Sequence, residues 1–212
     1  GRRRIAYDEL FLLQLGGRLK RHHRQTTLHA PALRWDDKVR SRIEARVPFT
    51  LTDSQQQVIE EIAKDVTQTV PMNRLLQGDV GSGKTVVALH AMLMAVVGDA
   101  QAALMAPTEL LAEQHYNTIT EMLRGSSVSV ALLTSSLGTK DRKKLIEDVS
   151  SGKIDIIIGT HALLTSDVVF SNIAVSIVDE QHRFGVHQRA TLRNKRDDDE
   201  TVPHTLVMTA TP

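Results

Sequence analysis

The chain has 212 residues, a length that allows one large domain or one domain with a flank. Hydrophobic residues make up 41% and charged residues 24% of it, which excludes an extensively disordered chain. There is no cysteine, so a disulfide scaffold and a thiolate metal site are excluded, and the cytoplasm is the expected compartment. No apolar run approaches the roughly 20 residues of a membrane helix, so no membrane association is expected.

The net charge of +1 hides an asymmetry between two parts of the chain. Residues 1–50 hold 12 Lys and Arg against 5 Asp and Glu, a net charge of +7, whereas the rest holds 14 and 20, a net charge of −6. A basic flank beside an acidic body is compatible with an anionic partner. Aromatic residues are only 3% of the chain, so stacking of bases on aromatic side chains cannot be the main mode of nucleic-acid binding.

Residues 1–48 are expected to form a helical flank and linker. Apolar residues recur at helical spacing over residues 5–20. The stretch that follows contains two prolines and predicts an irregular linker with a short helix near residues 36–46. Residues 49–212 are expected to form the main domain. Neither end has the features of a natural terminus, so we expect the chain to be part of a longer protein.

From residue 49 onward, short apolar runs alternate with helical stretches. The expected strands are residues 74–77, 102–106, 128–133, 154–159, 174–178 and 205–208. The expected helices are residues 53–66, 85–97, 110–123, 140–149 and 185–194. Strands that alternate with helices of this length predict βαβ units, and therefore an α/β domain with a mostly parallel sheet and helices on both faces.

A glycine-rich loop follows the first expected strand and matches the P-loop pattern G-x-x-x-x-G-K-S/T. Glycines let backbone N–H groups surround phosphate, and the following helix presents its amino terminus to the anion. Lys84 would neutralise the β- and γ-phosphates of a nucleotide, and the Thr85 hydroxyl would bind Mg²⁺. The residues of the loop assigned to nucleotide binding are Gly78, Asp79, Val80, Gly81, Ser82, Gly83, Lys84 and Thr85.

An acidic pair ends the expected strand at residues 174–178. Asp179 stands at the carboxyl end of this strand, where P-loop enzymes place a Mg²⁺-binding carboxylate. Glu180 is suited to polarise the attacking water as a general base. An acidic strand cap is the alternative, but about a hundred residues after a P-loop the catalytic interpretation is favoured. We therefore assign Lys84, Asp179 and Glu180 as catalytic, and Thr85 and Asp179 as Mg²⁺ ligands.

The set of motifs resembles that of superfamily 2 helicases, whose motor domains are RecA-like. The similar segments are Phe49 with Leu51, Thr52 and Gln55 (the adenine-reading Q motif), the P-loop (motif I), residues 106–111 (motif Ia), residues 159–163 (motif Ib), residues 179–182 reading Asp-Glu-Gln-His (motif II) and residues 209–211 reading Thr-Ala-Thr (motif III). Longer segments such as "APTELLAEQHY" and "VDEQHRFGVHQR" are similar to bacterial ATP-dependent DNA helicases that remodel branched DNA.

The resemblance implies a motor of two RecA-like domains that hydrolyse ATP between them and move on duplex DNA. Such enzymes regress stalled replication forks and migrate Holliday junctions, in recombination and repair. This chain matches only the first motor domain, and motifs IV to VI, with the arginine finger, are not within it. Because an arginine finger is worth about 10³–10⁵ in rate, we expect this chain alone to hydrolyse ATP slowly. We also expect it to be monomeric.

The resemblance also implies roles for individual residues, each with a plainer alternative. Phe49 and Gln55 would read adenine, although Gln55 equally fits a capping box with Thr52, and Phe49 equally fits packing. Pro107, Thr108, Glu109, Thr160 and His161 would contact DNA. His182, Thr209 and Thr211 would couple the ATP site to DNA. Thr108 also fits a helix cap, and a loop histidine such as His161 or His182 is often only solvated.

Three other functions are considered. The transcription-repair coupling factor is a similar translocase, but Ser82 and Gln181 stand where it has Phe and Glu. A small-molecule P-loop kinase gives no reason for the motifs at residues 106–111 and 159–163. A non-catalytic module with a vestigial P-loop is opposed by the intact Lys84 and its acidic partners.

Overall fold

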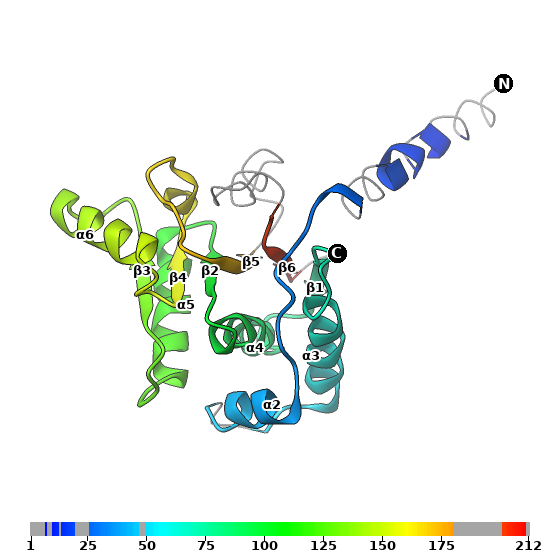
Figure 1. Cartoon of the computed structure of the whole chain (residues 1–212), viewed down its shortest axis with the longest axis horizontal. Helices are drawn as coiled ribbons and strands as arrows, with labels where there is room; N and C mark the ends of the chain where they lie inside the picture. The colour runs from blue at the N-terminus through cyan, green and yellow to red at the C-terminus, as the bar shows by residue number, and fades with distance from the viewer. Residues whose placement is uncertain are drawn as a thin grey trace.

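The chain is built around a parallel six-stranded sheet (Figure 1). Its computed structural model describes residues 7, 10–12, 14–19, 26–46, 50–179 and 201–210. The strands are β1 (Asn73–Gln77), β2 (Gln101–Met105), β3 (Val130–Leu133), β4 (Ile156–Gly159), β5 (Ile173–Asp179) and β6 (His204–Thr209). Their order across the sheet is β1-β6-β5-β2-β4-β3. The six expected strands and their parallel arrangement are confirmed, with bounds that shift by at most two residues.

Two helices precede β1, namely α2 (Asp37–Glu44) and α3 (Asp53–Val66). Consecutive strands from β1 to β5 are connected by α4 (Lys84–Val97), α5 (Glu109–Met122), α6 (Thr139–Ser150) and the 3₁₀ helix η1 (His161–Leu164). Each was expected except η1, which is too short to show a helical period. The helix expected at residues 185–194 lies outside the described residues. Within the described part of the chain, no helix is both long and apolar enough to cross a bilayer.

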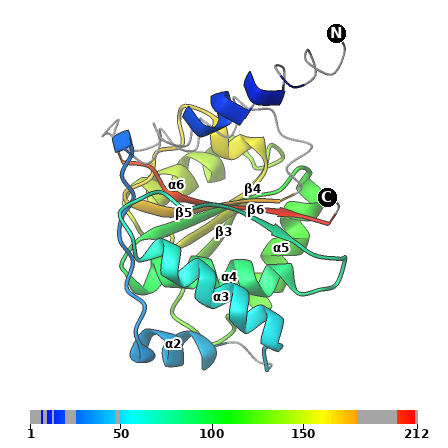
Figure 2. The same cartoon turned by 90° about the vertical axis from the view of Figure 1, so that its right-hand side faces the viewer.

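The helices form a layer on each face of the sheet (Figure 2). Apolar side chains of α3, α4 and α5 pack against one face, and those of α6 and η1 pack against the other. The strands supply residues to both cores: Ile156 and Ile158 belong to the first and Ile157 to the second. Burial on both faces explains why β4 is a continuous apolar run.

Helix α4 lies at the centre of the first layer. Every residue from Val86 to Ala95 is buried, because α4 contacts α2 and α3 as well as β2 and β5. A helix covered on all sides has no need of a polar face, which accounts for an apolar sequence from Val86 to Val97 that only His90 interrupts. This packing holds the start of α4, at Lys84, in a fixed position at one edge of the sheet.

The segment before residue 50 contributes to the same core. Leu33, Val39 and Ile43 are buried in it, and the backbone N–H of Leu33 donates to the carbonyl of Val66 at 2.8 Å. An ion pair between Arg40 and Glu60 joins α2 to α3. The predicted domain boundary at residues 48 and 49 stays a prediction, and the flank packs against the following domain.

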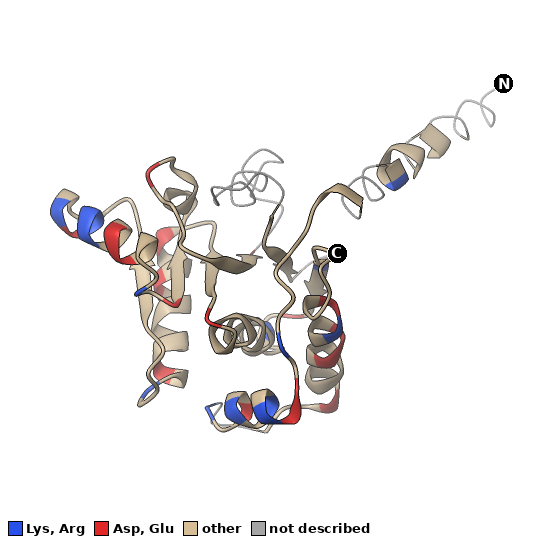
Figure 3. Ribbon diagram, viewed as in Figure 1, with Lys and Arg blue, Asp and Glu red and all other residues tan. Residues whose placement is uncertain are grey.

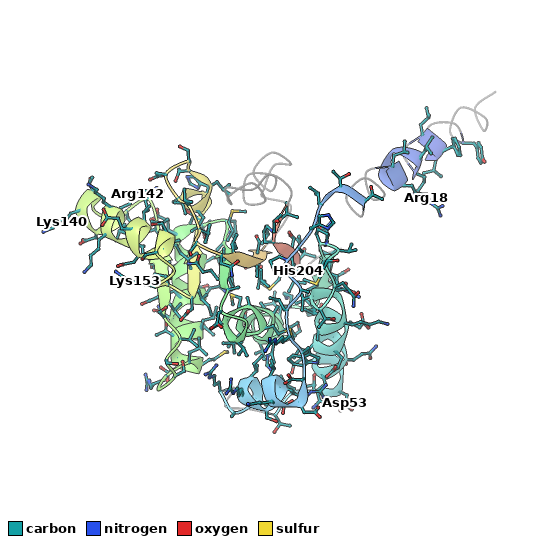
Figure 4. The ribbon with its side chains drawn as sticks, viewed as in Figure 1. Arg18, Asp53, Lys140, Arg142, Lys153 and His204 are labelled. Atoms are coloured by element: carbon teal, nitrogen blue, oxygen red, sulfur yellow. The ribbon has the colours of Figure 1, made fainter. Side chains whose placement is uncertain are left out.

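His204 joins three separate segments of the chain (Figure 4). Its Nδ1 accepts the backbone N–H of Met72 at 3.1 Å, and its Nε2 donates to the carbonyl of Pro31 at 2.9 Å. Burial lowers the pKa of His204, although the hydrogen bond to Pro31 acts the other way. Burial also lowers the pKa of His90 in α4. Both imidazoles are therefore neutral in the folded chain at neutral pH.

The neutral state of these histidines predicts acid sensitivity. Unfolded histidine has a pKa of about 6.5, so below that pH the unfolded chain takes up protons that folded His90 and His204 do not, and stability falls as the pH falls. Between pH 5 and 6.5, His204→Gln should make the slope of unfolding free energy against pH shallower, by up to about 1.4 kcal/mol per pH unit. Urea unfolding at several pH values in this interval measures the slope. An unchanged slope in His204→Gln, equal to that of exposed His161→Gln, would contradict the prediction.

Candidate functional site

The carboxyl ends of three adjacent strands meet at one edge of the sheet. Strand β6 lies between β1 and β5, with Gln77 opposite Thr209 and Met208 opposite Asp179. The P-loop continues from β1, and Asp179 ends β5. Since neighbouring strands are about 4.8 Å apart, the ends of β1 and β5 are separated by roughly 10 Å. The sheet therefore brings the P-loop and the first candidate acid together.

Asp179 and the first turn of α4 also share one face of the sheet. Val175 and Ile177 belong to the core that contains α4, and alternation along the strand places Asp179 on that face. Helix α4 begins at Lys84 and Thr85 and contacts β5. The hydroxyl of Thr85 and the carboxylate of Asp179 therefore lie on the same side of the same edge.

The P-loop is a compact turn. Gly81 and Gly83 have φ angles of +82° and +83°, which other residues rarely adopt. The backbone N–H of Gly78 donates to the carbonyl of Thr209 at 3.3 Å, which ties the loop to β6. Lys84 Nζ donates to the carbonyl of Gly78 at 2.6 Å and to that of Asp79 at 2.8 Å, so the lysine lies over the loop. Its ammonium is thus held where the pattern requires a positive charge.

Gln55 connects α3 to the P-loop. Its Oε1 accepts the backbone N–H of Thr52 at 3.0 Å, and the Thr52 hydroxyl accepts the backbone N–H of Gln55 at 3.3 Å, which confirms the capping box. Its Nε2 donates to the carbonyl of Ser82 at 3.1 Å. The side chain therefore caps its own helix and contacts the P-loop at the same time.

Asp179 has a partner in α5. Its Oδ2 lies 2.7 Å from Nε2 of His115, and each of the two side chains is only 13% exposed. The segment that contains His115 was part of the sequence resemblance, but no role was predicted for the histidine. The sequence alone does not reveal which strand a single histidine in a helix will face.

The site fits a nucleotide with a magnesium ion. A Cβ atom at Gly81 would meet no described atom within 4 Å, and Val80 is 90% exposed, so the loop is open on its outer side. No side chain caps α4 at Gly83, which leaves its amino terminus to an anion. Among the described residues no three His, Asp or Glu side chains gather to hold a metal. Thr85 and Asp179 would therefore share the ion with phosphate oxygens, as Mg²⁺ sites usually do.

The candidate DNA residues that follow β2 have local roles in the structure. The Thr108 hydroxyl accepts the backbone N–H of Leu111 at 3.3 Å, which confirms that Thr108 caps α5. Glu109 Oε1 accepts the backbone N–H of Ser135 at 2.8 Å. Pro107 lies between the strand and this cap. The side chains of Thr108 and Glu109 thus fix the loop, and a DNA role for its backbone stays a prediction.

The candidate residues that follow β4 are partly buried. Thr160 is 1% exposed, and its hydroxyl accepts the backbone N–H of Ala162 at the start of η1. His161 is exposed beside it. The backbone N–H of Ala106 donates to the carbonyl of Gly159 at 2.8 Å, so the loops after β2 and β4 are neighbours. The structure therefore gathers the two candidate DNA segments at one edge.

Thr209 is the coupling candidate that the structure describes. It ends β6, is 6% exposed and bonds to the P-loop through its carbonyl. Four other predicted residues lie outside the described part of the chain: Phe49, Glu180, His182 and Thr211. Their roles stay predictions.

Comparison with known proteins identifies the family. The model of the DEAD/DEAH box helicases matches residues 52–212. The chain therefore belongs to the DEAD/DEAH box helicase family. A DEAD box protein from Methanococcus jannaschii has the same fold, with a TM-score of 0.62 at 20% identity over 87% of this chain and 50% of that one.

Within this family the chain resembles the RecG helicases. It is 47% identical to the ATP-dependent DNA helicase RecG of Aquifex aeolicus over 99% of this chain and 26% of that protein, and 46% identical to that of Bacillus subtilis over 100% of this chain and 30% of that protein. A structure of RecG bound to a three-way DNA junction matches with a TM-score of 0.86 and 41% identity, over 100% of this chain and 28% of that one. The chain thus spans about a quarter to a third of the length of these relatives.

Two glycines of the P-loop give a matched prediction. Alanine at either position meets the same positive φ, which costs about 1–3 kcal/mol. At Gly83 the new Cβ would also clash with Nε2 of Gln55, whereas Gly81 has open space. Gly83→Ala should therefore lower the free energy of unfolding by about 1 kcal/mol more than Gly81→Ala, because the Gln55–Ser82 hydrogen bond is also lost. Denaturant unfolding measures the free energy of unfolding of both variants. Equal losses in the two variants would contradict a role for the contact between Gly83 and Gln55.

Proposed function

We propose that this chain binds ATP with Mg²⁺ and acts as the first motor domain of a RecG-type DNA helicase that remodels branched DNA. The observation that carries the proposal is the shared edge of β1, β6 and β5, where the P-loop follows β1 and Asp179 ends β5 on the two sides of β6. The family match and the similarity to RecG support the same function. The three-way junction in the RecG structure supports branched DNA as the substrate.

At the ATP site, each residue has a distinct task. The backbone N–H groups of the loop and of the first turn of α4 bind phosphate oxygens. Lys84, whose ammonium contacts the carbonyls of Gly78 and Asp79, would offset the charge of the β- and γ-phosphates. Thr85 and Asp179 would hold the Mg²⁺, which would supply positive charge to offset that of the phosphate oxygens. Glu180 accepts the proton of the attacking water.

The DNA side of the proposal depends on the edge formed by β2 and β4. Met105 lies opposite Gly159 in the sheet, so the loops at residues 107–109 and 160–161 leave adjacent strands in the same direction. Backbone N–H groups in such loops suit phosphate contacts, which position DNA without reading its sequence. The ATP edge and this edge are continuous, because β5 pairs with β2.

The nucleotide site is tested with a fluorescent ADP analogue, titrated with and without Mg²⁺. Lys84→Ala should weaken binding at least about tenfold, because it removes a charge-assisted contact worth about 1.5–3 kcal/mol. Asp179→Asn should remove the gain in affinity that Mg²⁺ gives and leave affinity in EDTA unchanged. Lys140→Ala, on α6 at the opposite face of the sheet, is the control (Figure 4).

Two results would refute the proposal. One is wild-type affinity in Lys84→Ala. The other is an intact Mg²⁺ effect in Asp179→Asn, since both residues are assigned direct contacts with the nucleotide or its metal.

A further inference from the structure

The contact between His115 and Asp179 has no role in the mechanism above. It joins Nε2 of the imidazole to Oδ2 of the carboxylate at 2.7 Å, and both side chains are largely withdrawn from water. His115 comes from α5, whereas the other described residues assigned to the ATP site come from α3, from the P-loop with the first turn of α4, and from the end of β5. The histidine therefore brings a further element to the candidate metal ligand.

Helix α5 holds His115 in place. Ala112 and Ile119 are completely buried against the sheet, and His115 stands three residues after the first and four before the second. Residues at this spacing share one face of a helix, so His115 projects from the packed side of α5. The start of the helix is anchored as well, since Glu109 bonds to the backbone of Ser135. The imidazole therefore cannot move far from Asp179 unless a packed helix moves with it.

The chemistry of the pair favours orientation of the carboxylate. A carboxylate that is removed from water is stable only when its oxygens have partners, and the imidazole N–H supplies one. A hydrogen bond to Oδ2 also fixes the rotation of the carboxylate, and therefore the direction in which Asp179 offers its oxygens. Hydrogen bonds of this kind to metal-binding carboxylates are typically worth 10–100-fold in metal affinity. The structural alternative is a hydrogen bond that only fastens α5 to β5.

We propose that His115 is a positioning residue for the magnesium ligand Asp179. The inference rests on the proposed function, because it assigns Asp179 to the ion, and it adds a residue that touches neither nucleotide nor metal. His115 acts by holding the carboxylate of Asp179 in the direction that metal binding needs. The structural alternative predicts a loss of stability without a specific effect on Mg²⁺.

The test measures the affinity of the chain for a fluorescent ADP analogue in Mg²⁺ and in EDTA, together with the melting temperature. His115→Leu removes the donor and should reduce the gain in affinity from Mg²⁺ by about tenfold or more, with the affinity in EDTA unchanged. His115→Gln should keep most of the gain, since its amide N–H can reach the place of imidazole Nε2. Gln114→Ala, an exposed neighbour on α5, should match the wild type throughout.

A second pair of polar variants covers the case in which His115→Leu does not fold. His115→Asn has the amide of His115→Gln on a side chain that is one carbon shorter and cannot reach Asp179. The inference requires a larger Mg²⁺ gain in His115→Gln than in His115→Asn. Equal gains in these two variants would overturn it.

Two outcomes separate the inference from the proposed function. The positioning role is overturned by a full Mg²⁺ gain in a folded His115→Leu variant, or by equal losses of affinity in Mg²⁺ and EDTA with a lower melting temperature. In either case Lys84→Ala would still weaken binding, so the proposed function would stand. If the wild type binds no nucleotide, or Lys84→Ala binds like the wild type, the proposed function itself fails and this inference fails with it.

Discussion

The insertion of β6 between β1 and β5 is the constraint on which the candidate site depends. Because all three strands are parallel, their carboxyl ends reach the same edge, and the P-loop and Asp179 meet there although a hundred residues separate them in the chain. The hydrogen bond from Gly78 to Thr209 fastens the loop to the middle strand. An antiparallel β6 would carry Thr209 to the opposite edge and leave the loop without this support.

Packing of the helices also fixes the direction in which the amino terminus of α4 points at the edge of the sheet. Helix α4 is buried on every side, so its amino terminus cannot turn away from the edge of the sheet. Gln55 adds a lateral restraint from α3 to Ser82. Figure 3 shows that α3 is acidic and that α2 and α6 are more basic. The ion pair between Arg40 and Glu60 joins α2 to α3. The flank is therefore held against the parallel-sheet domain through α3.

Helix α5 links the two functional edges. Its first residues, Thr108 and Glu109, form the loop assigned to DNA, and its second turn holds His115 against Asp179. The helix is packed on the sheet through Ala112 and Ile119. The loop at Thr108 and Glu109 and the side chain of His115 are therefore attached to the same packed element. Helix α5 is therefore one packed element that contacts both the loop proposed to bind DNA and the carboxylate proposed to bind Mg²⁺.

The sequence by itself determined the α/β class, the six strands, the P-loop and the capping box of Thr52 and Gln55, because these depend on local periodicity and on short patterns. It did not give the strand order, the bond from Gln55 to Ser82, the burial of His204 between Pro31 and Met72, or the meeting of His115 with Asp179. Each of these joins segments far apart in the chain. Only the tertiary structure decides such contacts, since no local pattern records which surfaces pack together.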